Sequence, residues 1–241
     1  MSTPNITAYR AVKQKIVDAL RDEKWRHGQA IPSETALARR FDVSVGTVRR
    51  AVAELSAEQI LVKQQGRGTF VVSHTRDYML NVFFQIVDRH GRKELPQTEL
   101  LSFRRGRAEP PAAKALGLAA GELVFRIHTL QRLQGQPVII DHLRFPVRLF
   151  ADLNAEVFAK RDTTIYGLLQ MRYGVSVVRS EESIEATSAD AHSARLLQIA
   201  PGTPLLRIHR TGFAYKDLPV ETRVRYVNTA NHRYLSMLGA R

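Results

Sequence analysis

The side chains whose types and spacing suggest a specific chemistry are Thr47, Arg49 and Arg50, which are predicted to share one face of a helix. The other face of this helix carries hydrophobic residues at the i, i+3, i+4, i+7 spacing of a single buried stripe. These residues are Val48, Ala51, Val52 and Leu55. Ser44 precedes the helix and is suited to be its N-cap, because its hydroxyl can accept a free N–H of the first turn. A helix that buries one stripe and presents arginines from its N-terminal half has the form of a recognition helix in a DNA major groove.

A basic hairpin is predicted directly after this helix. Ile60–Gln64 and Thr69–Val72 are strand-like runs with a tight turn between them. Gly66 and Gly68 tolerate the positive φ that such a turn requires, which places Arg67 at its tip. An arginine in that position can enter the minor groove or bind phosphate beside a helix in the major groove.

A shorter helix precedes the recognition helix and completes the order helix, turn, helix, wing. Ser33 is its predicted N-cap, and Glu34–Arg40 forms the helix, with Glu34 favourably placed against the helix dipole. Each element alone is common, whereas the three in this order and spacing indicate a winged helix-turn-helix. We therefore predict that residues 1–72, which begin with an amphipathic helix at Tyr9–Glu23, form a DNA-binding domain.

The composition agrees with a nucleic-acid partner and excludes several other classes of site. The 241-residue chain has a net charge of +13, which suits binding to a polyanion. It has no cysteine, so disulfides and Cys-ligated metals are excluded, and its eight histidines include no i, i+3 or i, i+4 pair. No apolar run approaches the roughly 20 residues that cross a bilayer, and the polar N-terminus lacks the hydrophobic segment of a signal peptide. We expect a cytoplasmic protein with no membrane partner, metal or cofactor.

The pattern changes after the predicted wing. Residues 73–80 begin with a polar stretch without periodicity, which indicates a linker. Strand signals dominate beyond it and predict two antiparallel hairpins. The hairpins pair Leu123–Leu133 with Val138–Phe145 and Leu205–Tyr215 with Val220–Val227. We predict an α+β protein in which residues 81–241 form an antiparallel sheet with flanking helices.

This second region is internally duplicated. Leu116–His128 aligns with Leu197–His209, and six pairs of residues are identical, among them Arg126 with Arg207 and His128 with His209. A strand-like run and a short helix precede each copy, so each unit is expected to be strand, helix, tight turn and hairpin. Two such units would form one antiparallel sheet with helices packed against it, with a pseudo-twofold axis as one possible relation. The helical segment Asp162–Tyr173 lies between the copies and is expected to cover an edge or a pocket.

Two pairs of cationic residues mark the repeat. Arg126 and His128 alternate along one strand and Arg207 and His209 along the other, so each pair projects from one face of the sheet. If that face lies in solvent, these are ordinary exposed charges. If it lines a cavity between sheet and helices, they form an anion-receptive site. Both interpretations stay open, and Arg126, His128 and Arg207 are candidate ligand-binding residues.

The ordered motifs resemble those of a known family. Residues 32–34, 44–51 and 65–70 look like the winged helix-turn-helix of GntR-type bacterial transcription regulators. The second region is similar to the HutC branch, whose ligand-binding domain is called UTRA and has a chorismate-lyase-like fold. The residues that carry this second resemblance are Leu116-Gly117-Leu118, Gly135-Gln136-Pro137-Val138, Thr164-Ile165-Tyr166, Pro201-Gly202-Thr203-Pro204 and Pro219-Val220-Glu221. The resemblance covers nearly the whole chain and implies a homodimeric repressor that binds a palindromic double-stranded operator and responds to a small metabolite.

The resemblance also implies roles for single residues in DNA binding. Arg49 would be a major-groove contact, Thr47 a phosphate or base contact, and Gly66 with Arg67 the wing in the minor groove. The candidate DNA-binding set is completed by Ser33, Ser44, Arg50 and Gly68.

Two departures from the family pattern predict a different operator. Many relatives have arginine at the positions of Thr35 and Val45. Because a bidentate arginine–guanine contact contributes roughly 1–3 kcal/mol of discrimination, the loss of two should change the operator rather than merely weaken binding.

In the second domain the resemblance implies that Thr164 and Tyr166 contact the effector with hydroxyl groups, and that Asp141 and Glu221 contact it with carboxylates. Such groups can orient a small polar ligand inside a concave site.

A further departure concerns the ligand itself. Relatives that bind phosphorylated sugars carry two arginines in the strand before the Gly135 turn, where an ungapped match puts Thr129 and Gln131. This argues against a sugar phosphate as effector, although Arg126 or Arg132 could serve if the register slips by one residue.

Two other functions remain to be weighed. The first is an enzyme of chorismate-lyase-like fold, for which the sequence offers no cysteine nucleophile, metal cluster or phosphate-binding glycine loop next to a helix. The second is a constitutive nucleic-acid-binding protein without an effector. An effector-responsive repressor accounts for more of the sequence than either.

Overall fold

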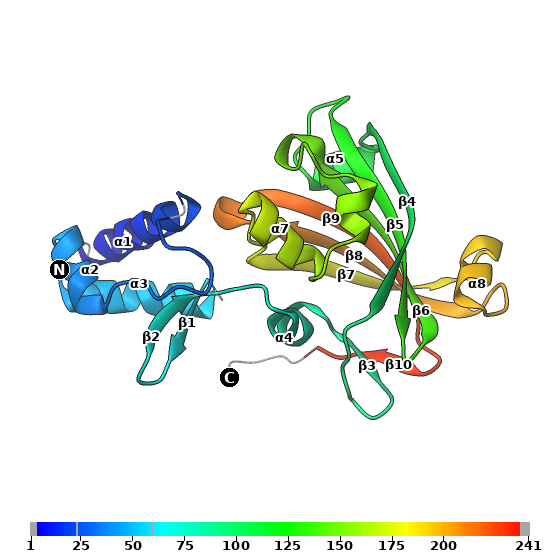
Figure 1. Ribbon diagram of the computed structural model, residues 1–241, viewed down its shortest axis with the longest axis horizontal. Coiled ribbons are helices and arrows are strands. Elements are labelled where there is room, and N and C mark those ends of the chain that lie inside the picture. The colour runs from blue at the N-terminus through cyan, green and yellow to red at the C-terminus, as the bar shows by residue number, and fades with distance from the viewer. Residues whose placement is uncertain (1–3, 23, 59, 237–241) are drawn as a thin grey trace. The chain divides into compact units, whose positions relative to one another are not determined.

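The computed structural model describes residues 4–22, 24–58 and 60–236 (Figure 1). The chain divides into two compact units, Met1–His74 and Thr75–Arg241.

Unit 1 has the predicted order of a winged helix-turn-helix. Its elements are α1 (Pro4–Arg21), α2 (Glu34–Phe41), α3 (Val45–Ala57) and the antiparallel hairpin of β1 (Leu61–Gln64) with β2 (Gly68–Val71). The apolar stripe of α3 is fully buried at Val48, Ala51, Val52 and Leu55, as its spacing predicts. Helix α1 ends at Arg21, and Glu23, the expected end, lies outside the described residues.

The expected linker at residues 73–80 is largely helical instead. Thr75 accepts the N–H of Tyr78 at 3.2 Å and so starts the short helix α4 (Arg76–Tyr78), which continues into a π-helical turn, η1 (Met79–Phe83). The prediction of an aperiodic linker was wrong here because a side-chain cap and the burial of Phe83 stabilise helical turns that are too short to show a period.

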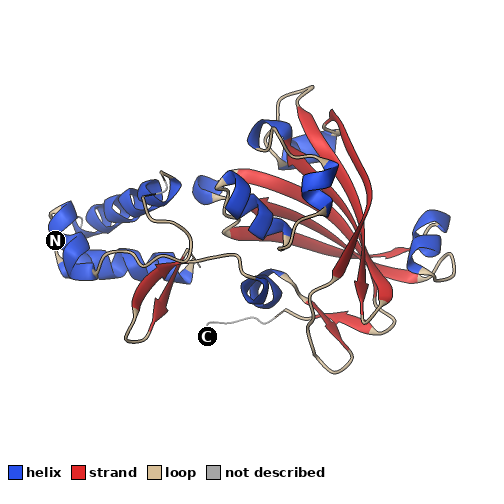
Figure 2. Ribbon diagram, in the orientation of Figure 1, coloured by secondary structure: helices blue, strands red, loops and turns tan. Residues whose placement is uncertain are grey.

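Unit 2 is built on a six-stranded antiparallel sheet (Figure 2). Its strands are β4 (Gln97–Arg107), β5 (Leu123–Leu133), β6 (Gln136–Pro146), β7 (Arg179–Ser188), β8 (Pro204–Phe213) and β9 (Pro219–Asn228). They lie in the order β4-β5-β6-β9-β8-β7, so each repeat supplies one half and the two inner strands, β6 and β9, meet at the centre. This arrangement confirms that the duplicated sequence forms a single sheet.

Helices cover both faces of this sheet. Helix α8 (Ala191–Leu197) packs on one face against β6, and α5 (Pro110–Ala115) lies against β9. Helices α6 (Ala155–Ala159) and α7 (Ile165–Tyr173) pack on the other face. The remaining elements are a small sheet of β3 (Ile86–Asp88) with β10 (His232–Tyr234) and the 3-10 turns η2 (Val147–Leu149) and η3 (Tyr215–Asp217).

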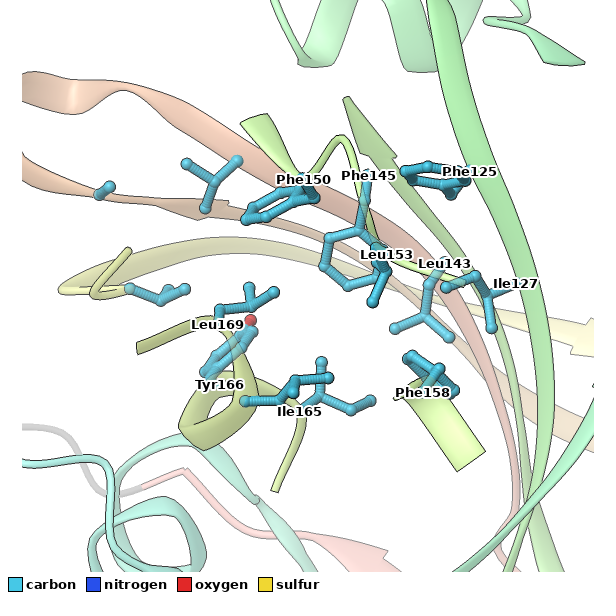
Figure 3. Packing of buried hydrophobic residues seen from close by; sticks show 14 of the residues in the cluster. Phe125, Ile127, Leu143, Phe145, Phe150, Leu153, Phe158, Ile165, Tyr166 and Leu169 are labelled. Carbon is cyan, nitrogen blue, oxygen red and sulfur yellow. The ribbon is translucent and has the colours of Figure 1, made fainter. Parts of the chain in front are cut away.

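The largest hydrophobic cluster lies between the sheet and the helices α6 and α7 (Figure 3). Phe125 and Ile127 of β5 point into it together with Leu143 and Phe145 of β6. Because side chains alternate along a strand, the neighbouring residues of β5 and β6 must point to the face of the sheet that α8 covers. This alternation determines on which face of the sheet each predicted site residue lies, and therefore which of them can line the same cavity.

Candidate nucleic-acid interface and ligand cavity

Hydroxyl side chains hold the starts of α2 and α3. Ser33 caps α2 by accepting the N–H of Ala36 at 3.2 Å, and Ser44 caps α3 by accepting the N–H of Thr47 at 3.1 Å. The Thr47 hydroxyl lies 2.8 Å from that of Ser44, and Thr47 is 8 % exposed. The sequence predicted that Thr47 lies on the exposed polar face of the helix. Its side chain instead turns toward the N-cap residue Ser44 and is buried. The capping hydrogen bonds of Ser33 and Ser44 therefore fix the N-terminal ends of α2 and α3.

Arg49 is an exposed cation of α3 that an acidic residue of α2 holds in place. Its side chain is 66 % exposed, and its Nε donates to Glu34 at 2.9 Å. Lys63 of β1 donates to the other Glu34 oxygen at 3.1 Å. Burial alone would raise the pKa of Glu34, but hydrogen bonds from Arg49 and Lys63 outweigh it and lower the pKa. A carboxylate shared by two exposed cations competes with DNA phosphate for both of them.

Arg50 faces a different direction from Arg49. Its guanidinium lies 4.1 Å from the ring centre of Tyr9, which is a buried residue of α1. Adjacent residues of an α-helix point about 100° apart, so Arg50 and Arg49 do not share one face. The sequence prediction that grouped them was wrong in this respect.

The wing has the predicted glycine-dependent turn. Gly66 has φ 71° and Gly68 has φ 114°, which are backbone conformations that other residues rarely adopt. Arg67 lies between them and is exposed, with its guanidinium 5.8 Å from the ring centre of Phe70.

Unit 2 contains a cavity of about 300 Å³ beside the start of α7. Its wall is formed by α4, η1, the start of β4 with the segment before it, the start of α7 and the strands β5, β8 and β9. The polar lining residues are Arg76, Gln97, Thr98, Gln131, Arg161, Thr163, Thr164, Tyr166, Arg210, Arg223 and Arg225. Thr164 and Tyr166, which the family resemblance implies as effector contacts, both line this cavity, and Thr164 also caps α7 by accepting the N–H of Gly167 at 3.1 Å.

Asp141 and Glu221 are fully buried and hold arginines. Asp141 accepts two hydrogen bonds from Arg225, both at 2.7 Å, and one from Gln131 at 2.9 Å. Glu221 pairs with Arg223 through both of its oxygens. Burial would raise the pKa of Asp141, but the charge of Arg225 outweighs it and lowers the pKa. Neither carboxylate is among the cavity-lining residues, so their expected direct contact with a ligand is replaced by a role in positioning arginines.

Arg126, His128 and Arg207 do not line this cavity. They alternate with the core residues of their strands and so lie on the other face of the sheet. Arg126 pairs with Glu109 at 3.2 Å, Arg207 donates to Glu185 at 2.7 Å, and the His128 ring stacks on His142. These three residues therefore lie on the face of the sheet that α8 covers, each only partly exposed, and not in this cavity.

Five arginines of the cavity were missed in the sequence, including Arg76 of α4. Arg223 and Arg225 are two positions apart in β9, and Arg210 is opposite Arg223 in β8, so strand alternation could have grouped the three. No periodic signal distinguishes Arg161, which precedes α7 in an irregular segment. Gln131, expected to replace a family arginine, lines the cavity, whereas Thr129 is fully buried beside it in β5.

Comparisons with known proteins connect both units to one family. Residues 8–71 match the family described as bacterial regulatory proteins, gntR family, and residues 91–233 match the UTRA domain. The chain is 32 % identical over 216 residues to the "Probable transcriptional regulator PhnF" of Escherichia coli, with 86 % of each chain covered. It is 29 % identical over 203 residues to the "Histidine utilization repressor" of Pseudomonas putida, with 84 % of this chain and 80 % of the relative covered.

Solved structures show the same architecture. The ligand-binding domain of a GntR-family regulator from Bordetella bronchiseptica is 32 % identical with a TM-score of 0.61, and the match covers 64 % of this chain and 96 % of that one. The regulator YydK of Bacillus subtilis, at 16 % identity and a TM-score of 0.57, shares the fold over 96 % of this chain and 99 % of its own. Within the described residues, no helix is both long and apolar enough to cross a membrane.

Proposed function

Because the chain belongs to the GntR family of bacterial regulatory proteins and carries a UTRA domain, we propose that it is a repressor whose operator affinity changes when a small ligand fills the cavity of unit 2. Relatives named as repressors support the direction of regulation. The same membership favours a regulator over the alternative of an enzyme with this fold.

The observation that carries the effector part of the proposal is the position of α4 and η1. Arg76, Met79 and Phe83 of this segment line the cavity, and the segment follows the DNA-binding unit directly along the chain. A ligand changes an equilibrium only through different affinities for the two states. A ligand that contacts these residues acts on the segment that follows the DNA-binding unit along the chain, and a conformational change in that segment is the proposed route from ligand binding to α3.

We assign base reading to Arg49 and backbone or minor-groove contact to Arg67 of the wing. The exposure of Arg49 in the N-terminal half of α3 and the glycine turn that projects Arg67 support these roles. Two copies related by a twofold axis would match two half-sites of a palindromic operator, so the acting species is proposed to be a cytoplasmic homodimer.

A gel-shift experiment on the intergenic DNA beside the chain's own gene tests the proposal. The wild-type chain should prefer this DNA to a scrambled duplex, and Arg49→Ala should reduce that preference by roughly 5- to 150-fold, the equivalent of one arginine–base contact. Arg21→Ala, which removes an exposed cation of α1, is the matched control and should change it less than about twofold. Equal binding to both duplexes by the wild-type chain would rule out sequence-specific recognition at this site.

A further inference from the structure

The charges around the cavity of unit 2 are balanced except at two arginines. Arg210, Arg223 and Arg225 are each buried and paired with a carboxylate: Glu182, Glu221 and Asp141 respectively. Three cations and three anions leave no net charge in this network. These arginines therefore add no uncompensated charge that would attract an anion, although they can still donate hydrogen bonds to a ligand.

Arg161 is the less exposed of the two cavity-lining arginines that have no carboxylate counter-ion in the described part of the chain. Its Nη1 donates to the backbone carbonyl of Phe158, and its guanidinium stacks 4.4 Å from the Phe158 ring centre. Its Nε is buried without a hydrogen-bond partner, and no carboxylate pairs with it among the residues that the structure describes. Burial lowers the pKa of Arg161 to about 10, so it still carries its charge at neutral pH. Arg76, the other arginine without a carboxylate, is exposed and donates to the carbonyl of Asp162 at 2.6 Å, so water screens its charge.

The start of α7 adds a second attraction for an anion at the same place. Thr163, Thr164, Ile165 and Tyr166 line the cavity, so the N-terminus of this nine-residue helix faces it. The side chain of Thr164 caps the N–H of Gly167, whereas the N–H of Ile165, in the first turn, has no acceptor within the helix. The start of a helix favours negative charge through such N–H groups and through the helix dipole.

Gln131 supplies a hydrogen-bond acceptor on another wall of the cavity. Its Nε2 donates to Asp141 at 2.9 Å, which fixes the orientation of the amide because a carboxylate can only accept. Its Oε1 is then buried without a partner, on a side chain that is 3 % exposed. A buried oxygen of this kind is satisfied when a ligand donates an N–H or O–H to it.

From these observations we propose that the cavity binds a small organic acid with one negative charge, its acidic group at Arg161 and the start of α7, and a hydrogen-bond donor at Gln131. This inference rests on the proposed function in one respect, namely that the acid is the effector. One partly buried cation without a counter-ion calls for one negative charge, and the side chains of Met79, Phe83 and Ile165 provide an apolar wall for the carbon skeleton.

The acidic end can be tested with probes too small for the cavity to exclude. Acetate, acetamide and methyl phosphate are titrated into the full chain at constant ionic strength while the Nε–Hε NMR signal of Arg161, assigned with Arg161→Gln, is followed. Acetate should shift this signal saturably with a Kd of about millimolar, as expected for a four-atom ligand, and acetamide should not. Methyl phosphate, largely a dianion, should bind no tighter than acetate.

Matched variants show whether Arg161 carries the selectivity. The Ile165 and Tyr166 amide signals report acetate binding in every variant. Arg161→Gln should weaken it at least about 10-fold, and Arg161→Lys, which keeps the charge, should weaken it less. Arg132→Gln, which removes a cation of β5 outside the cavity that pairs with Glu99 at 3.7 Å, should leave it unchanged. No saturable response to acetate, an equal response to acetamide, or methyl phosphate binding more than about 10-fold tighter would overturn the assignment of a singly charged acid.

The donor end is tested with aliphatic acids of two to six carbons and their hydroxy derivatives. At least one hydroxy acid should bind about fivefold or more tighter than its parent acid, and Gln131→Leu should abolish that gain. A series with no such gain, or a gain that survives in Gln131→Leu, would refute the role of Gln131. DNA binding is measured in parallel on the same samples. If the chain binds its operator but shows no preference for acids, the proposed class of ligand is refuted and the proposed DNA-binding function is not.

Discussion

Glu34 is predicted to restrain binding to DNA of unrelated sequence. It lies at the start of α2 and binds Arg49 of the recognition helix and Lys63 of the wing, at 2.9 and 3.1 Å. Both cations are at least half exposed, so in the free protein the carboxylate occupies two groups that phosphates could bind. Glu34→Gln keeps the size of the side chain and removes this competition.

The expected magnitude follows from the two contacts. An exposed ion pair contributes about 0.2–1 kcal/mol, so releasing two should tighten binding to non-specific DNA by about 0.4–2 kcal/mol, or roughly 2- to 30-fold. Each cation newly available to phosphate should also steepen the dependence of log K on log salt concentration by about 0.9. Operator binding should gain less, because Arg49 loses the partner that orients it, so the ratio of specific to non-specific affinity falls.

Fluorescence anisotropy with labelled operator and scrambled duplexes, at several salt concentrations, measures all three quantities. Glu54→Gln is the matched control, since it removes a carboxylate of the same unit that pairs with Lys13 of α1 at 3.3 Å. The reasoning would be refuted if Glu34→Gln left non-specific affinity and salt slope unchanged, or if Glu54→Gln changed them equally.

Two further predictions concern the stability of unit 2. Asp141→Asn should lower the free energy of unfolding, measured in urea, by about 3–5 kcal/mol, because it removes the charge of a fully buried partner of Arg225. Asp152→Asn, which changes an exposed ion pair, should lower it by less than about 1 kcal/mol. Equal losses in the two variants would contradict the assigned burial. Burial, reinforced by the charges of His142 and Arg144, lowers the pKa of His128 to about 4 from a usual 6.5. The unfolded chain therefore binds the proton more tightly than the folded chain, so the free energy of unfolding should fall as the pH drops from 6.5 toward 4. In urea unfolding measured at several pH values, His128→Gln should make this fall shallower. The same pH dependence in both proteins would argue against the assigned role of His128.

The winged helix-turn-helix could be predicted from the sequence because its information is local. The caps at Ser33 and Ser44, the stripe beginning at Val48 and the glycine turn at Gly66 each act over a few residues. Side-chain direction was less predictable. Arg50 turns to Tyr9 of α1, a contact between residues that are far apart in the chain.

The ligand cavity was only partly predictable because it depends on strand register. The repeat predicted a single sheet with paired halves, and Thr164 and Tyr166, which the family motif suggested as ligand contacts, line the cavity. The sequence left open whether Arg126 faces a cavity, and it lies on the face that this cavity does not use, since one residue of register moves a side chain across a sheet. Arg161 could not be found, because its significance lies in having no carboxylate paired with it among the described residues, which is a property of three-dimensional packing.

The most direct test of the account is the dissociation constant of the full chain for its intergenic DNA, measured by anisotropy with and without a small acid. The acid used is the member of the two- to six-carbon series that binds most tightly, at a saturating concentration. Sequence-specific binding is expected without the acid, and binding at least about 10-fold weaker is expected with it, a coupling of ordinary size for allosteric regulators. The same operator affinity in both conditions, with the acid shown to be bound, would contradict the claim that this cavity controls DNA binding.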